Sequence, residues 1–138
     1  MATDRLVDDF LAVWRLLRVN THPVRRGEIT PEQYWLLKLL NKHGTLSVSE
    51  LADALGVTGS SVTTACKRLE KSGLLQRVRQ KNGQDERVVR VSLTIQGQEQ
   101  IDAWQQERRA ALAQMLTPLT QPEQAELQHL LERILEHG

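Results

Sequence analysis

Several features that define other protein classes are missing from this sequence. It contains a single cysteine, so no internal disulfide bond can form. No apolar run approaches the roughly 18 residues that a membrane-spanning helix needs. The N-terminus also lacks the basic segment and apolar core of a signal peptide. We therefore expect a cytoplasmic protein that does not contact a membrane.

Motifs of catalysis and metal binding are missing too. The sequence has no Gly-rich phosphate loop, no nucleophile motif and no carboxylate constellation. Its four histidines show no ligand-like spacing, and no cysteine stands near them. We expect neither an enzyme nor a protein with a bound metal or cofactor.

Positive charge is concentrated in one part of the chain. The whole sequence has a formal net charge of only +1. Residues 58–91 contain eight Lys and Arg against three Asp and Glu, a net charge of +5, which leaves −4 for the rest. A basic segment within a near-neutral chain is typical of proteins that bind a polyanion. A solvated surface whose charge is balanced across the fold remains the alternative.

Residues 47–71 carry the pattern of two short helices joined by a tight turn. Ser47 and Glu50 form a capping box that starts the first helix, and Gly56 supplies the turn. Thr58 then caps a second helix, which has apolar residues on one stripe: Val62, Ala65, Cys66 and Leu69. This spacing predicts a helix-turn-helix unit, whose second helix enters the DNA major groove.

The exposed face of this second helix is predicted to be small and polar at its start and basic further along. Ser60, Ser61, Thr63 and Thr64 are followed by Lys67 and Lys71. Short hydroxyl side chains allow close approach to bases and phosphates, and the helix dipole favours phosphate. An ordinary polar surface helix is the alternative.

A basic hairpin follows the second helix. Two partly alternating β-branched runs, residues 74–79 and 87–93, flank an Asn82-Gly83 turn signal. Arg and Lys residues lie toward the tip, which suits contact with a DNA backbone. The alternative is an edge hairpin protected from aggregation by its charges.

Helices are expected on both sides of this unit. Residues 4–20, 30–43, 94–116 and 120–136 have helical apolar spacing, and three of these segments begin at a Thr cap: Thr30, Thr94 and Thr120. The fold class is thus mainly α (α+β): a winged helix-turn-helix DNA-binding domain over residues 30–94. Residues 1–20 and 95–138 carry apolar faces that the small domain cannot cover, which predicts an intertwined homodimer. A monomeric core is the alternative.

These residues resemble the MarR (multiple antibiotic resistance regulator) family of winged-helix transcription factors over almost the whole chain. The resemblance is most specific in residues 46–63, in Arg68-Leu-Glu-Lys-Ser-Gly-Leu74, and in the wing pattern Asp85-x-Arg87-x5-Leu93-Thr94-x-x-Gly97. It implies a dimer on a pseudo-palindromic operator, usually repressing nearby genes. It also implies release from DNA by small phenolic or other anionic ligands, or by oxidation.

The sequence departs from the family where bases are read. Family members often have Arg at the position of Thr64, an acid at that of Lys67, and a second Arg at that of Glu86. Asp85 can pair with Arg87 and shape the wing. The residues expected at the DNA interface are Ser60, Ser61, Thr63, Thr64, Lys67, Lys71, Arg77, Arg79, Lys81 and Arg87.

The few aromatic residues suggest a ligand pocket. All five lie outside the predicted recognition helix and wing, on helices that surround a pocket in this family. With a nearby Arg (Arg15, Arg18 or Arg108), such a cleft suits a small aromatic or anionic effector. The expected pocket residues are Trp14, Arg15, Tyr34, Trp35, Trp104 and Arg108. Packing in the core or the dimer is the alternative.

Three other functional interpretations stay open. A winged-helix module can bind proteins instead of DNA, and a DNA-bound regulator can activate instead of repress. Cys66 could serve as a redox switch, but it falls on the apolar stripe of the recognition helix, where buried thiols are usually inert.

Overall fold

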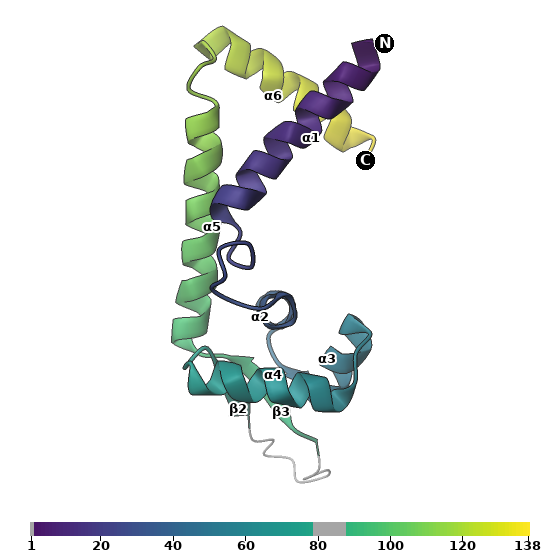
Figure 1. Ribbon diagram of the computed structural model, residues 1–138, viewed down its shortest axis with the longest axis vertical. Coiled ribbons are helices and arrows are strands. Elements are labelled where there is room, and N and C mark those ends of the chain that lie inside the picture. Colours follow the sequence, from purple (N-terminus) through teal and green to yellow (C-terminus); the bar gives the residue numbers. More distant parts are fainter. Residues whose placement is uncertain (1, 79–87) are drawn as a thin grey trace.

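The computed structural model describes residues 2–78 and 88–138 and is elongated, with a compact end and a helical end (Figure 1). The compact end, called the head below, contains a three-stranded sheet and the helices α2 (Pro31–His43), α3 (Val48–Leu55) and α4 (Gly59–Lys71). Helix α5 (Ile95–Met115) rises from the head, α1 (Ala2–Thr21) lies beside it, and α6 (Gln121–Glu136) crosses its far end. The predicted mainly α fold with a small sheet is confirmed.

Threonine and serine caps set where five of these helices begin. Thr30, Ser47 and Thr120 each form a complete capping box with the Gln or Glu three residues later. Thr58 and Thr94 each accept a hydrogen bond from the backbone N–H three residues on. Each bond satisfies an N–H that the helix itself leaves unpaired. The predicted helix starts are therefore confirmed.

The sheet is small and antiparallel, in the order β1-β3-β2. Strand β3 (Arg90–Leu93) pairs with β1 (Leu46–Ser47) on one side and β2 (Leu75–Val78) on the other. Leu46 is thus part of a short edge strand. Residues 79–87, which lie between β2 and β3 in the sequence, are outside the described part of the chain.

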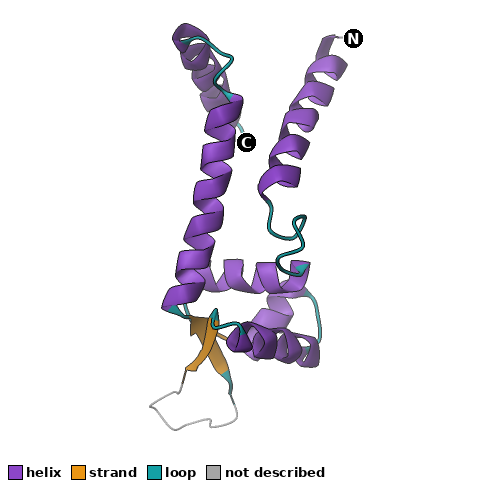
Figure 2. Cartoon of the chain, turned by 60° about the vertical axis from the view of Figure 1, so that its left-hand side comes forward, coloured by secondary structure: helices purple, strands orange, loops and turns teal. Residues whose placement is uncertain are grey.

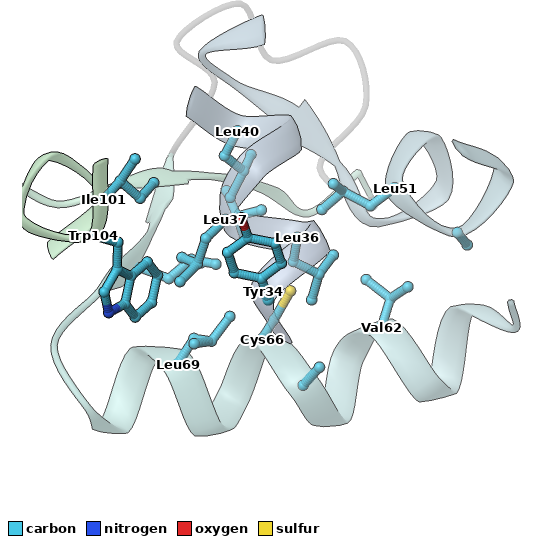
Figure 3. Close-up of a cluster of buried hydrophobic side chains, with 14 residues drawn as sticks. Tyr34, Leu36, Leu37, Leu40, Leu51, Val62, Cys66, Leu69, Ile101 and Trp104 are labelled. Atoms are coloured by element: carbon cyan, nitrogen blue, oxygen red, sulfur yellow. The ribbon is translucent and has the colours of Figure 1, made fainter. Parts of the chain in front are cut away.

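The hydrophobic core belongs mainly to the head. Leu36 and Leu37 of α2, Leu51 of α3 and Val62 of α4 are fully buried, and Figure 3 shows them gathered over α4. By contrast, large apolar side chains on the helical end are uncovered: Leu6, Val7, Phe10, Leu11, Val13, Trp14, Leu16, Leu112, Leu130, Leu131, Ile134 and Leu135. Within the described part of the chain, α1 packs mainly against α5 and is exposed over most of its length.

Only Thr94, the cap of α5, separates that helix from β3. Thr94 directly follows β3, and its hydroxyl donates a 2.6 Å hydrogen bond to the carbonyl of Gly73, while its N–H donates to that of Leu74. Gly97, one turn into α5, is buried so closely that a Cβ atom there would overlap the Leu74 carbonyl oxygen. The end of α4, the start of β2 and the start of α5 therefore form one tightly packed joint.

Candidate nucleic-acid interface

Helix α4 has one buried and one exposed stripe. Val62, Ala65, Cys66 and Leu69 are buried against the head. On the opposite side, four exposed residues repeat at helical spacing and share one face: Ser60, Thr64, Lys67 and Lys71. We call this exposed set the α4 face. It presents hydroxyl groups near the helix N-terminus and two cations further along, as the sequence predicted.

The hydroxyl groups of the α4 face make only short-range bonds. The Thr64 hydroxyl donates to the carbonyl of Ser60 at 3.0 Å, and the Ser60 hydroxyl lies 3.2 Å from that of Thr58. Beside the face, the Thr63 hydroxyl donates to the carbonyl of Gly59 at 2.9 Å. Such bonds satisfy the hydroxyls without fixing α4 relative to the rest of the head.

Ser61 is held differently from its neighbours. Its hydroxyl donates to both carboxylate oxygens of Glu32, at 2.8 and 3.1 Å. Glu32 belongs to the first turn of α2. The backbone N–H of Ser61 donates to the cap hydroxyl of Thr58 at 3.1 Å. Ser61 was expected to face DNA, but its hydroxyl is engaged within the head. Glu32 was not singled out from the sequence, because its partner is 29 residues away and no local motif links them.

The other residues expected at the DNA interface belong to the predicted wing. Arg77 on β2 is exposed and pairs with Glu70 of α4, Nε to Oε1 at 2.9 Å. This pair links β2 to the C-terminal half of α4. Arg79, Lys81, Asp85 and Arg87 lie outside the described residues, so their expected roles at the wing stay predictions.

Cys66 is enclosed by the core between α4 and α2, as Figure 3 shows. Burial, with a smaller contribution from Glu70, raises the pKa of the Cys66 thiol to about 11. At neutral pH the thiol is therefore almost entirely protonated, and the thiolate is the form that oxidants attack. This environment does not favour the redox-switch alternative.

A cavity of about 400 Å³ lies between α1, α2 and α5. Four of the five aromatic residues line it: Trp14, Tyr34, Trp35 and Trp104. Tyr34 packs against Trp35 and Trp104 with ring centroids 5.7 and 6.0 Å apart. The Trp104 indole N–H donates to Glu28 at 3.2 Å and so is already satisfied. The aromatic residues expected to share a pocket are thus brought together.

The cations of this cavity differ in part from those expected. Arg18 and Arg108 line it, and so does Lys38, which the sequence analysis did not single out. Arg15 instead lines a neighbouring cavity of about 200 Å³. The helical period explains why Arg18 and not Arg15 lines this cavity. Arg18 is four residues from Trp14 and shares its face of α1, with its guanidinium 4.8 Å from the centre of the Trp14 ring. Arg15 follows Trp14 directly and so points about 100° away around the helix.

The pKa of His22, which also lines this cavity, is affected by burial and by the positive charges around it. Its ring packs against Tyr34 at 4.5 Å, and its Nδ1 accepts a hydrogen bond from the Val24 N–H at 3.2 Å. Burial, and then the positive charges of Arg18, Arg108 and Lys38, lower the pKa of His22 below its ordinary value. The described residues that line the cavity include no acid, so it offers an apolar, electropositive environment.

Two further observations concern partner classes. Among the described residues, no three His, Cys, Asp or Glu side chains gather in a way that could hold a metal ion. No helix in the described part of the chain is both long and apolar enough to cross a membrane.

Comparison with known proteins identifies sequence relatives over nearly the full length. The family model described as MarR family matches residues 28–87, which span the head from before α2 to the hairpin. The chain is 35% identical to the HTH-type transcriptional repressor MdtR of Bacillus subtilis, over 96% of this chain and 88% of that protein.

Solved structures share the architecture as well. Transcriptional regulator Tm0710 from Thermotoga maritima superposes with a TM-score of 0.81 at 25% identity, over 96% of this chain and 93% of that one. A MepR mutant of S. aureus bound to an oligodeoxyribonucleotide gives a TM-score of 0.78 over 96% of both chains. At 22% identity, the second likeness concerns the fold alone.

Proposed function

Because the chain belongs to the MarR family, whose members are DNA-binding transcriptional regulators, we propose that it is a ligand-responsive repressor that binds a pseudo-palindromic operator as a homodimer. Residues 30–94 form its DNA-binding domain, and residues 1–20 and 95–138 its dimerisation region. It acts by occupying DNA rather than by catalysing a reaction.

The observation that carries this proposal is the α4 face. Ser60, Thr64, Lys67 and Lys71 form an exposed, cationic stripe on a helix whose other side is anchored in the core. A helix so presented fits a major groove, with the hydroxyls and Lys67 near base edges and Lys71 near phosphate. Two copies would read half-sites about 34 Å apart, one turn of DNA.

Selection of bound sequences from a random duplex pool tests the proposal. We expect a recovered motif with two-fold symmetry and half-sites about 10 base pairs apart, centre to centre. Lys67→Ala should weaken binding to that motif, and His129→Ala, an exposed change on α6, should not. Absence of any enriched motif at low salt would favour the alternative of a winged-helix protein-interaction module.

The uncovered apolar surface supports the homodimer. Leu6 and Phe10 on α1 are 67% and 57% exposed, and Ile134 and Leu135 on α6 are 60% and 76% exposed. Contiguous apolar surface on this scale usually marks an interface with another chain. A second copy of the chain would cover this apolar surface and would also place two heads on one DNA.

The cavity between α1, α2 and α5 supports control by a small aromatic anion. Aromatic walls suit a flat apolar body, and Arg18, Lys38 and Arg108 suit a carboxylate or phenolate. Such a ligand can release DNA only if it binds the DNA-competent and the incompetent head spacing unequally.

Titration with benzoate, followed by tryptophan fluorescence, tests this part of the proposal. We expect saturable quenching with the wild type and weaker binding by Arg108→Ala and Arg18→Ala. Arg133→Ala on α6, which does not line the cavity, should bind like the wild type. Equal binding by all four proteins would contradict an effector site in this cavity.

A further inference from the structure

The Glu32–Ser61 hydrogen bond joins two elements that are otherwise held by apolar contacts. Ser61 lies in the first turn of α4 and Glu32 in the first turn of α2, and both side chains are only partly exposed. Apolar packing is non-directional, so it resists separation of two helices more than it resists rotation of one about its axis. A hydrogen bond requires both distance and angle, and thus constrains that rotation.

The position of Ser61 makes the constraint effective. On α4 it follows Ser60 by one residue and so lies about 100° around the helix, at the border between the buried stripe and the α4 face. A bond at the border prevents the helix from rolling in either direction. The neighbouring hydroxyls of Thr63 and Thr64 bond within α4 and do not have this effect.

We propose that Glu32 is a positioning residue for DNA recognition: it holds the hydroxyl of Ser61 and thereby sets the rotation of α4 that presents Ser60, Thr64 and Lys67 to base edges. Ser61 belongs to this support and is not itself a base contact. Phosphate contacts tolerate a small roll of the helix because long lysine side chains can follow, whereas bidentate or close base contacts do not. Glu32 therefore governs discrimination between sequences more than overall affinity for DNA.

The inference rests on the proposed recognition of an operator through α4. Its test compares the affinity for the selected operator with that for a random duplex of equal length. We expect Glu32→Ala to reduce this ratio about tenfold, the factor for losing one hydrogen bond to a charged group. Binding to the random duplex should not fall, because the change removes a negative charge near the DNA-facing side.

Four variants separate positioning from charge. Glu32→Gln keeps an oxygen that accepts from Ser61 and should retain most of the wild-type ratio. Ser61→Ala should lower the ratio as Glu32→Ala does, and the double variant should lower it no further, because both changes remove the same bond. Glu99→Ala, an exposed acid on α5, removes the same charge elsewhere and should leave the ratio unchanged.

The outcomes distinguish this inference from the proposed function. Failure of the wild type to select any motif would contradict operator recognition itself. A wild type that selects a motif, together with a Glu32→Ala ratio within twofold of it, would contradict only the role of Glu32. A Glu32→Gln ratio as low as that of Glu32→Ala would contradict a hydrogen-bond role, and urea denaturation of each variant identifies any loss of folding.

Discussion

Gly97 shows how one missing side chain keeps two elements in contact. A methyl group there would overlap the backbone carbonyl of Leu74, which cannot move aside as a flexible side chain could. We expect Gly97→Ala to lower the free energy of unfolding by roughly 1–3 kcal/mol, the usual cost of overpacking a well-filled site. Urea denaturation followed by circular dichroism measures this change.

Gly59 provides a matched control for that substitution. It begins α4 with nothing within 4 Å of the position its Cβ would take, and its φ is not in the left-handed region. We expect Gly59→Ala to leave stability unchanged or raise it by up to about 1 kcal/mol, the difference in helix propensity. Equal destabilisation by both substitutions would mean that the close contact at Gly97 is not the cause.

Cys66 leads to a prediction about pH. Its folded-state pKa of about 11 lies above its ordinary value of 9.0, so folding favours the protonated thiol. The resulting stability is fully present below pH 9 and is lost as the pH rises toward about 11. The free energy of unfolding should therefore fall more steeply over this interval in the wild type than in Cys66→Ala. Parallel slopes would contradict the burial of the thiol.

The same thiol should resist oxidants at neutral pH. Treatment of the wild type with hydrogen peroxide at pH 7 should leave its affinity for the operator within about twofold of the untreated protein, because little thiolate is present. Cys66→Ser should respond in the same way. Release of DNA by peroxide from the wild type alone would restore the redox-switch alternative.

Residue-scale features were predictable where the cause is local. The pairs Thr30–Gln33, Ser47–Glu50 and Thr120–Glu123 are three residues apart, and each formed the capping box that its sequence indicated. The Glu32–Ser61 bond was not predicted, and the sequence left open whether Arg15 or Arg18 lines the cavity. The first depends on how α2 packs on α4, and the second on which face of α1 turns toward α5, and both are tertiary outcomes.

At the scale of elements, α4 combines two kinds of DNA contact that salt can separate. Lys71, at its C-terminal end, is far from the hydroxyls and is suited to phosphate. We expect Lys71→Ala to weaken operator and random duplex by similar factors and to reduce the slope of log K against log salt by about 0.9. Thr64→Ala should instead weaken the operator more than the random duplex. Identical effects of the two changes would contradict this division.

The helices and the head's sheet were largely predictable, because apolar residues repeat along them at a regular spacing and cap or turn residues mark their ends. Residues 94–116 were expected as one helix, and α5 spans Ile95–Met115. The tip of the wing stays a prediction, because residues 79–87 lie outside the described part of the chain. The joint at Gly97 was visible in sequence only as part of the family's wing pattern; its physical reason, contact with Leu74, required the packed structure.

At the scale of the whole molecule, the exposed apolar side chains of α1 and α6 lead to a prediction about the dimer: a charge introduced among them should weaken it. Ile134 and Leu135 lie on one apolar side of α6, and His129 on the other side of that helix. We expect Ile134→Glu to raise the dimer dissociation constant at least about a hundredfold, since burying an unpaired charge costs several kcal/mol. Sedimentation equilibrium measures this constant.

His129→Glu adds the same charge on the opposite side of α6 and should leave the dimer intact. Ile134→Glu should also weaken operator binding, because a single head holds only one half-site. A wild type that sediments as a monomer at micromolar concentration would contradict the proposed homodimer and leave the exposed surface of α1 and α6 for another partner.

The joint that holds the base of α5 against β2 has a mechanical consequence. A helix of 21 residues is about 30 Å long. Because its base is packed tightly against the head, α5 and the head are expected to move together as a rigid body. Tilting α5 by about 5° moves its far end by roughly 3 Å, so a small change where α5 meets α1 becomes a displacement of the whole head. In the proposed dimer we therefore expect the head and α5 to turn as one piece, so that the distance between the two heads can change without repacking of the head.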